Sequence, residues 1–183
     1  MDNYNASIYT NRLLLRKISL SDAIEIYSYS CKDQVSKYTI WDTHRSINDT
    51  ESYINTVIYK YQNGEPSDWG IIDLSTNKLI GTIGWVYINP THYRAEIGYA
   101  LSPTYWNKGI ITEAARSVLQ FGFNYLSLNR IEARCHLENV TSERVMQKIG
   151  MYFEGILRDY LWAYTQSVSV KLYSITRKDD FRF

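Results

Sequence analysis

The sequence predicts an α+β (mixed α/β) fold in which a central, mostly antiparallel sheet of about seven strands is flanked by about four helices. Apolar residues recur with a period of two between residues 68 and 101, as in half-buried strands. Two capping boxes precede helical patterns near the start of the chain. One amphipathic helix then joins two strands, which is typical of a right-handed parallel crossover. The 183 residues fit a single domain, residues 1–183.

The first half of the chain contains a strand at residues 12–18 and then two helices. Ser19 with Asp22, and Ser46 with Asp49, stand at capping-box spacing, so a helix should begin at each pair. The second helix has these apolar residues on one face: Ile47, Ile54, Val57, Ile58 and Tyr61. Three strands follow at residues 68–74, 78–88 and 93–101, and turn residues separate the first two.

The second half alternates helices and strands. The apolar face of a long helix is formed by Ala115, Val118, Leu119, Gly122 and Leu126. A strand at residues 130–137 follows, and Asn139 is a suitable N-cap for a short helix that Gly150 should end. Two last strands are expected near residues 152–164 and 167–177. The helix between two strands places the strand before it beside the strand after it, where ligands often bind.

The stretch YWNKGIITEAA, residues 105–115, lies where a strand ends and the long helix begins. The first amides of a helix lack intrahelical acceptors and lie at the positive end of its dipole, so they suit a phosphate. The Lys108 side chain could add a positive charge and the Thr112 hydroxyl a hydrogen-bond donor, and Gly109 would let a phosphate oxygen come close to the backbone. A lone glycine at such a junction is also an ordinary turn. Neither a Walker loop nor a GxGxxG fingerprint is present.

Composition excludes several classes of function. The net charge of +1 and the lack of a basic run argue against nucleic acid or a membrane as partner. Cys31 and Cys135 form no CxxC pattern and the three histidines share no ligand spacing, so we expect no metal. Unclustered thiols and the lack of a long apolar run favour a cytoplasmic location. The 17 tyrosines suit interfaces, which leaves a homo-oligomer open.

Several segments together resemble a known family. In chain order they are NRLLLRKISLSDA, LIGTIGW, RAEIGYALSPTYWNKGIITEAA, NRIEARCHLENVTSERVMQKIGM and EGILRDY. Their order and separations resemble the GCN5-related N-acetyltransferases (GNAT), in the branch of the ribosomal-protein N-terminal acetyltransferases RimJ and RimL. The resemblance covers about residues 10–178, nearly the whole chain. The combination is specific, although no single segment is.

The resemblance implies a GNAT-like sheet that splays between its fourth and fifth strands, with acetyl-CoA bound as co-substrate in that cleft. The family's pantetheine arm pairs with the fourth strand, which implies a first group of cofactor-binding residues: Ile97, Gly98, Tyr99, Ala100 and Leu101. The family's pyrophosphate lies on the loop before the next helix, which implies a second group: Asn107, Lys108, Gly109, Ile110, Ile111 and Thr112. Asn139 matches an asparagine near the pantetheine arm, and Ser142 matches a serine near the thiol.

The sequence also departs from the family pattern. Trp106 and Ile111 occupy the outer positions of the phosphate loop, and Asn107 stands where glycine is frequent. Asparagine tolerates a left-handed backbone, so the site should survive. Many members carry a tyrosine as general acid where this chain has Met146, which cannot donate a proton. Ser142 could replace it, or could only bond the backbone near the start of its helix.

Acetyl transfer to an amine also needs a base. Glu96 is the candidate, because it lies on the strand that should line the cleft, opposite to the apolar face, and Glu132 on the adjoining strand is its rival. The substrate could be met by Asp159, Tyr160 or His136, and a wall on the acceptor side could be formed by Trp41 and Trp85. Salt bridges and core packing explain these residues equally well.

The sequence therefore predicts an acetyl-CoA-dependent N-acetyltransferase in which a primary amine attacks the thioester directly. The acceptor is either a protein N-terminus, as in the RimJ/RimL branch, or a small amine such as a polyamine, an amino acid or an antibiotic. A non-catalytic acetyl-CoA-binding module remains the alternative from another class, and Met146 is its support.

Overall fold

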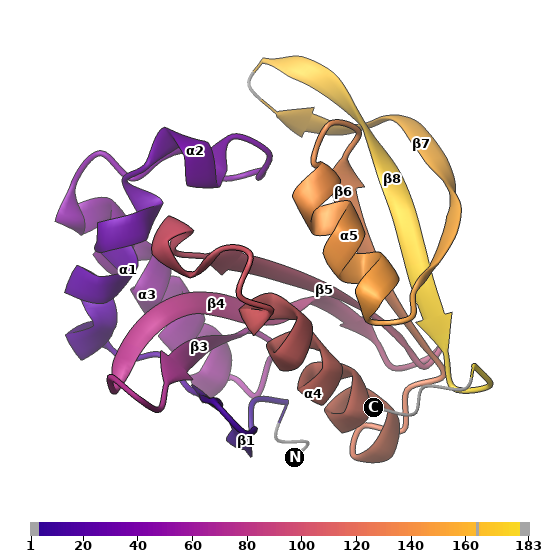
Figure 1. Ribbon diagram of the computed structural model, residues 1–183, viewed down its shortest axis with the longest axis horizontal. Coiled ribbons are helices and arrows are strands. Elements are labelled where there is room, and N and C mark those ends of the chain that lie inside the picture. Colours follow the sequence, from indigo (N-terminus) through magenta and orange to yellow (C-terminus); the bar gives the residue numbers. More distant parts are fainter. Residues whose placement is uncertain (1–3, 164, 180–183) are drawn as a thin grey trace.

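The computed structural model describes residues 4–163 and 165–179. Within them, eight strands form one sheet in the order β1-β2-β3-β4-β5-β6-β8-β7 (Figure 1). The strands are β1 (Ile8–Tyr9), β2 (Leu13–Arg16), β3 (Asp68–Asp73), β4 (Lys78–Asn89), β5 (Arg94–Leu101), β6 (Arg130–His136), β7 (Tyr152–Ala163) and β8 (Gln166–Thr176). The ends of the predicted domain, and Tyr164 at the end of the predicted sixth strand, lie outside the described residues.

The four predicted helices begin where the sequence predicts, and the described residues contain a fifth. They are α1 (Ala23–Ser30), α2 (Asp33–Ser36), α3 (Ile47–Gln62), α4 (Ile110–Asn124) and α5 (Val140–Lys148), with 3-10 turns at Leu20–Asp22 and Pro103–Tyr105. Both predicted capping boxes are present, before the 3-10 turn that leads into α1 and before α3. The structure adds two elements to the prediction, β1 and α2. Each spans four residues or fewer, too short to show a hydrophobic period.

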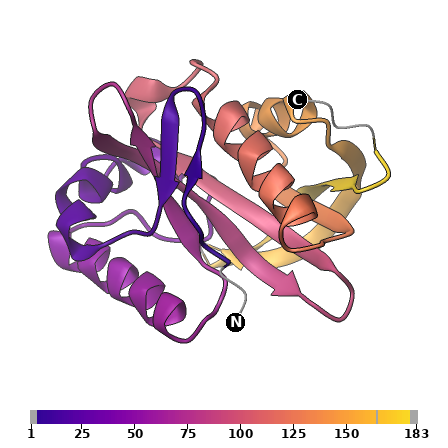
Figure 2. The same ribbon diagram turned by 90° about the horizontal axis from the view of Figure 1, so that it is seen from below.

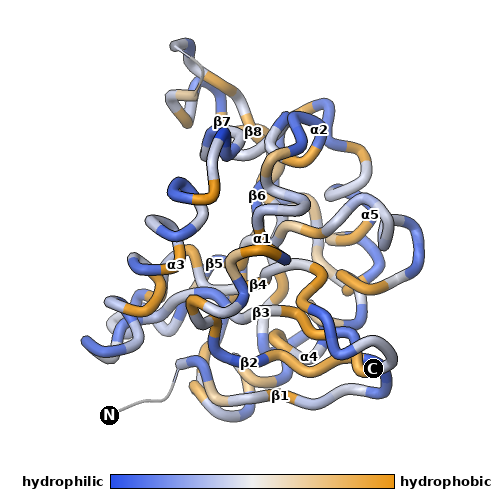
Figure 3. Tube along the Cα trace, turned by 90° about the vertical axis from the view of Figure 1, so that its left-hand side faces the viewer, coloured by the Kyte–Doolittle hydropathy of each residue, from blue (hydrophilic) through white to orange (hydrophobic). Residues whose placement is uncertain are grey.

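The sheet separates two hydrophobic clusters. The larger cluster lies under α4 and α5 and contains Trp69, Trp85 and Phe123, and the smaller lies under α1 and α3. Figure 2 shows the sheet between these two pairs of helices. In Figure 3 hydrophilic and hydrophobic turns alternate along α3, as expected of a helix with one buried face. Gly122 allows α4 to approach the sheet, because a Cβ there would lie 2.8 Å from Ile131 Cδ1.

The sheet opens between β5 and β6. Strands β1 to β5 pair antiparallel with their neighbours, whereas β5 and β6 are parallel. Their register runs only from Arg94↔Arg130 to Glu96↔Glu132, and beyond it the two strands diverge (Figure 1). The predicted splay is thus confirmed. Its strands are the fifth and sixth rather than the fourth and fifth, because β1 precedes the first strand that the sequence predicts.

Two searches of the described residues are negative. No helix there is long and apolar enough to cross a membrane. Among residues 4–163 and 165–179, no three His, Cys, Asp or Glu side chains gather in a group that could hold a metal ion.

Candidate functional site

The loop before α4 has the backbone shape of an anion site. Asn107 (φ 59°) and Gly109 (φ 73°) are both left-handed, which agrees with the tolerance expected of asparagine. The first amide to bond back into the helix is that of Glu113, which donates to the Gly109 carbonyl at 3.0 Å. The amides of residues 110–112 precede it and therefore have no acceptor in the preceding turn.

The space over this loop is open. A Cβ built on Gly109 would have one heavy atom within 4 Å, Nη2 of Arg12 at 3.7 Å. The side chains of Ile110 and Ile111 are buried in the larger cluster. Ile111, which departs from the phosphate-loop pattern of the family, therefore packs in the core with its side chain, and its backbone amide is still at the helix start. The Lys108 ammonium lies 5.2 Å from the centre of the Tyr105 ring, a cation–π contact. The loop residues therefore fit a pyrophosphate.

The indole of Trp106 ties the loop to the adjacent strand. Its Nε1 donates to the Leu101 carbonyl at 2.9 Å, at the end of β5. β5 pairs with β4 along residues 97–101, from Trp85↔Ile97 to Gly81↔Leu101, but its pairs with β6 end at Glu96. Its other edge therefore presents backbone groups that could pair with an extended ligand containing amides. All five predicted strand residues, 97–101, lie on this segment, beside the splay.

Ser142 lies in the first turn of α5 and faces β5. Its amide donates to Oδ1 of Asn139 at 3.1 Å, so the predicted N-cap is confirmed. Its hydroxyl lies 2.8 Å from the Tyr99 hydroxyl, and the latter also donates to the Ser142 carbonyl at 3.3 Å. Burial raises the pKa of Tyr99 far above its usual range, although the bond to Ser142 opposes the rise. Tyr99 therefore stays protonated at neutral pH.

The contact of the Tyr99 hydroxyl with Ser142 is a feature of the candidate site that sequence reasoning missed. Tyr99 stands three residues after Glu96 and so points to the opposite face of β5, and the family resemblance implied only a backbone role for it. The hydroxyl of a tyrosine that is surrounded by apolar residues usually has a hydrogen-bond partner. This preference is the signal in the sequence that could have indicated the contact. Met146, one turn after Ser142, is fully buried in the larger cluster. A proton donor near the start of α5 is therefore Ser142 or Tyr99, and not Met146.

Glu96 lies at the last pair of β5 and β6, where the splay begins, opposite its rival Glu132. It is 5% exposed, less open than a residue lining a cleft. Its carboxylate accepts two hydrogen bonds from Arg134, one from Nε to Oε1 at 2.8 Å and one from Nη2 to Oε2. Burial raises the pKa of Glu96 above its ordinary value, and the bonds and charge of Arg134 limit the rise.

The rival carboxylate is also occupied. Glu132 is 8% exposed, accepts a bond from the Tyr87 hydroxyl at 2.9 Å and pairs with Arg130 Nε at 2.7 Å. Two carboxylate–guanidinium pairs thus lie around the splay, each with a buried carboxylate and a partly exposed arginine, and Arg130 also pairs with Glu154. The Tyr160 ring lies against one of them, with the Arg134 guanidinium 4.6 Å from its centre.

The remaining predicted residues are spread over the molecule. His136 stacks on Tyr38 with ring centres 5.2 Å apart, and its Nδ1 accepts a bond from the Glu138 amide. Asp159 is exposed on β7 and accepts a bond from the Ser167 hydroxyl at 3.1 Å. Trp85 is 2% exposed inside the larger cluster, so core packing, and not a wall for the acceptor, accounts for it. Trp41 is half-buried with its ring 5.6 Å from that of His44.

Comparisons with known proteins agree with this geometry. Residues 12–152 match the family model of the acetyltransferase (GNAT) domain. The uncharacterized N-acetyltransferase YoaA of Bacillus subtilis is 36% identical over 168 residues, which are 92% of this chain and 95% of YoaA. A GNAT-family acetyltransferase structure from Bacillus anthracis has a TM-score of 0.85 at 31% identity, covering 95% of this chain and all of that one. The structure of RimL, a ribosomal L7/L12 α-N-protein acetyltransferase, in complex with coenzyme A has a TM-score of 0.83 at 19% identity. It covers 93% of this chain and 98% of RimL, and shows a shared fold.

Proposed function

The chain belongs to the GNAT family of acetyl-CoA-dependent N-acetyltransferases. We propose that it acts as members of the RimJ/RimL branch do, so that the N-terminal amine of a protein attacks the thioester directly and is acetylated. One observation carries the assignment of the cofactor. The edge of β5 that pairs with no described strand along residues 97–101 is followed, after the 3-10 turn at Pro103–Tyr105, by the left-handed loop at the start of α4. Acetyl-CoA has the matching order of groups, because its extended pantetheine arm contains amides and is followed by a pyrophosphate.

Two groups of residues would hold the cofactor. The backbone of residues 97–101 would pair with the pantetheine arm, and the amides of residues 108–112 would bind the pyrophosphate. Asn139 keeps α5 folded at its start, beside that arm. Acetyl-CoA supplies an activated acetyl group on a thiol leaving group. An amide of the splayed strand is placed to polarise the thioester carbonyl.

Ser142 carries the proton to the leaving sulfur, supported by Tyr99. A thiol has a pKa of about 8.5. A thiolate is therefore a weaker base than an alkoxide and can leave with less help from a proton donor. The Ser142 hydroxyl would give its proton to the departing sulfur and take one from the Tyr99 hydroxyl, 2.8 Å away, which would turn from the Ser142 carbonyl and regain a proton from solvent. The pair performs the role that Met146 cannot.

Glu96 takes the proton from the amine, directly or through a water molecule. An ionised carboxylate has about four lone-pair sites, and Arg134 uses two of those on Glu96. The remaining sites can accept a proton at the point where β5 and β6 part. An α-amine, whose pKa is about 8, needs less help from a base than a lysine side chain with a pKa of about 10.4.

The charges near the splay favour a monoamine as acceptor. Glu96 is paired with Arg134, and Glu132 is bonded to Tyr87 and to Arg130, which it shares with Glu154, so both carboxylates are already engaged where the second cation of a polyamine would need one. The matches point to both acceptor types, because a spermidine N(1)-acetyltransferase of Escherichia coli is 35% identical over 77 residues, 42% of this chain and 41% of that enzyme. The two ion pairs are the reason to place a protein N-terminus first. We also propose a cytoplasmic location, where Cys31 and Cys135 remain free thiols.

The test is thiol release from acetyl-CoA with three kinds of acceptor. These are short peptides with a free α-amine, the same peptides with a blocked α-amine and a free lysine, and spermidine. We expect release with the free α-amine and little with the other two. Release with spermidine alone would contradict the proposed acceptor, and release with none of the peptides would contradict a protein N-terminus.

A further inference from the structure

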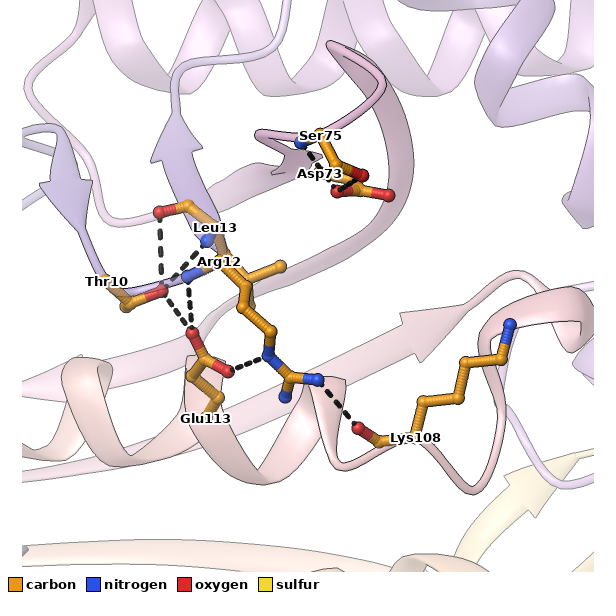
Figure 4. Close-up of polar contacts among 7 residues, drawn as sticks. All are labelled: Thr10, Arg12, Leu13, Asp73, Ser75, Lys108 and Glu113. Carbon is orange, nitrogen blue, oxygen red and sulfur yellow. Dashed lines mark hydrogen bonds and ion pairs between the residues drawn. The ribbon is translucent and has the colours of Figure 1, made fainter.

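Arg12, directly before β2, reaches the loop that precedes α4. Its Nη1 donates to the Lys108 carbonyl at 3.1 Å, and its Nε donates to Glu113 Oε2 at 2.7 Å (Figure 4). The two partners lie on either side of Gly109, in the loop and in the first turn of α4. A side chain 96 residues earlier in the chain is thus bonded to both ends of the loop–helix junction.

Glu113 fixes the position of this arginine. Its Oε1 accepts bonds from the Arg12 amide at 3.0 Å and from the Thr10 hydroxyl at 2.6 Å. The Thr10 hydroxyl oxygen in turn accepts a bond from the Leu13 amide at 3.0 Å. Burial alone would raise the pKa of Glu113, but the bonds from Thr10 and Arg12 hold it below its ordinary value. Glu113 is therefore ionised at neutral pH and holds both the backbone and the guanidinium of Arg12.

The bond to Lys108 acts on the conformation of the loop. Lys108 lies between two left-handed residues, Asn107 and Gly109, so its carbonyl belongs to the turn that leads into α4. The Lys108 carbonyl accepts its bond from Arg12 (Figure 4), and Nη2 of the same guanidinium lies 3.7 Å from the position of a Cβ on Gly109. The bond therefore engages a carbonyl oxygen close to the helix start, where the anion should bind.

We propose that Arg12 is a positioning residue that holds the loop at residues 107–109 in its pyrophosphate-binding conformation. The inference rests on the proposed function, because it deepens the role of the same loop. Arg12 acts through the Lys108 carbonyl and is itself anchored by Glu113. Its side chain is 50% exposed, and exposed ion pairs contribute little to stability. Loss of Arg12 should therefore change ligand binding more than folding.

The test compares two ligands on the same variants. Acetyl-CoA carries the pyrophosphate, whereas S-acetylpantetheine has the same acyl arm without it. In Arg12→Met, calorimetry should show about a tenfold loss of acetyl-CoA affinity, about 1.4 kcal/mol. The affinity for S-acetylpantetheine should stay nearly unchanged. Amide hydrogen exchange at residues 107–112 should become faster in the ligand-free variant. Arg45→Met is the control, since it removes an arginine from a more exposed ion pair, with Asp33 of α2, on another part of the molecule.

Arg12→Lys provides a second variant that keeps the charge, but an ammonium cannot reproduce the planar two-sided contact. It should lose acetyl-CoA affinity as Arg12→Met does, and it carries the test if Arg12→Met does not fold. Equal losses of affinity for both ligands in the Arg12 variants, or no loss for either ligand, would overturn the positioning role of Arg12. The proposed function would still stand in that case, provided that the wild-type protein binds acetyl-CoA. Wild-type protein that binds no acetyl-CoA would overturn the proposed function itself.

Discussion

The Tyr99 hydroxyl lies 2.8 Å from Ser142 Oγ, and this contact joins β5 to the first turn of α5 on the far side of the splay. It places two hydroxyl groups beside the segment assigned to the pantetheine arm. Removal of hydroxyl groups from water is costly unless they are hydrogen-bonded, so this partly buried contact also favours a fixed distance between the strand and the helix.

Removal of either hydroxyl should slow turnover and leave cofactor affinity nearly unchanged. A positioned acid is worth about 100-fold to 10,000-fold in rate, so Ser142→Ala should lower kcat by about 100-fold. Tyr99→Phe should have a smaller effect, because Tyr99 acts through Ser142. Steady-state kinetics and calorimetry with acetyl-CoA measure the two quantities separately. A normal kcat in Ser142→Ala would remove Ser142 from the mechanism.

Glu96→Gln should lower kcat and abolish the acidic limb of its pH profile. A base acts only when deprotonated, so the wild-type rate should fall as the pH drops through the Glu96 pKa, which burial raises above its ordinary value despite Arg134. That limb should therefore lie above about pH 4.3, the ordinary value of glutamate. The thermal stability of Glu96→Gln must be measured as well, because the substitution breaks the ion pair with Arg134 and can destabilise the fold.

Glu132→Gln is the matched control, because Glu132 lies opposite Glu96 and is paired with an arginine in the same way. Its kcat should stay within a few-fold of wild type. Unchanged turnover of Glu96→Gln at every pH would dismiss Glu96 as the base, and loss in Glu132→Gln alone would transfer that role to its rival.

The stabilising effect of Glu113 should depend on pH. Its pKa in the folded protein is lowered, so its contribution is complete above the ordinary glutamate value of about 4.3 and disappears as the pH falls through the folded pKa. Wild type should therefore melt at a higher temperature than Glu113→Gln at pH 7, and the difference should shrink in acid. If the difference in melting temperature between wild type and Glu113→Gln is constant from pH 7 to pH 3, the charge of Glu113 does not stabilise the folded protein.

Local features of the structure could be predicted from the sequence. The capping boxes at Ser19 and Ser46, the N-cap at Asn139 and the end of α5 at Gly150 (φ 83°) depend on residues a few positions apart. Residue preferences at such positions are strong. The left-handed conformation tolerated at Asn107 belongs to the same class.

Contacts between distant elements could not be predicted. Glu96 was expected beside the cleft, but its pairing with Arg134, 38 residues later, depends on the parallel register of β5 and β6. The Tyr99–Ser142 contact depends in the same way on where α5 packs, and alternation along one strand contains no such information. The family resemblance supplied the ligand and the splay, but not the partners that surround the candidate base.

The most direct test of the central claim is calorimetric titration with acetyl-CoA of wild type, Gly109→Ala and Gly109→Glu. Both substitutions strain a backbone at φ 73°, at about 1 kcal/mol, and the open space around Gly109 admits a Cβ. Only the glutamate adds a negative charge where the pyrophosphate should lie. We predict measurable binding in wild type, weaker binding in Gly109→Ala and none in Gly109→Glu. Equal binding by the alanine and glutamate variants would contradict a pyrophosphate site at the start of α4.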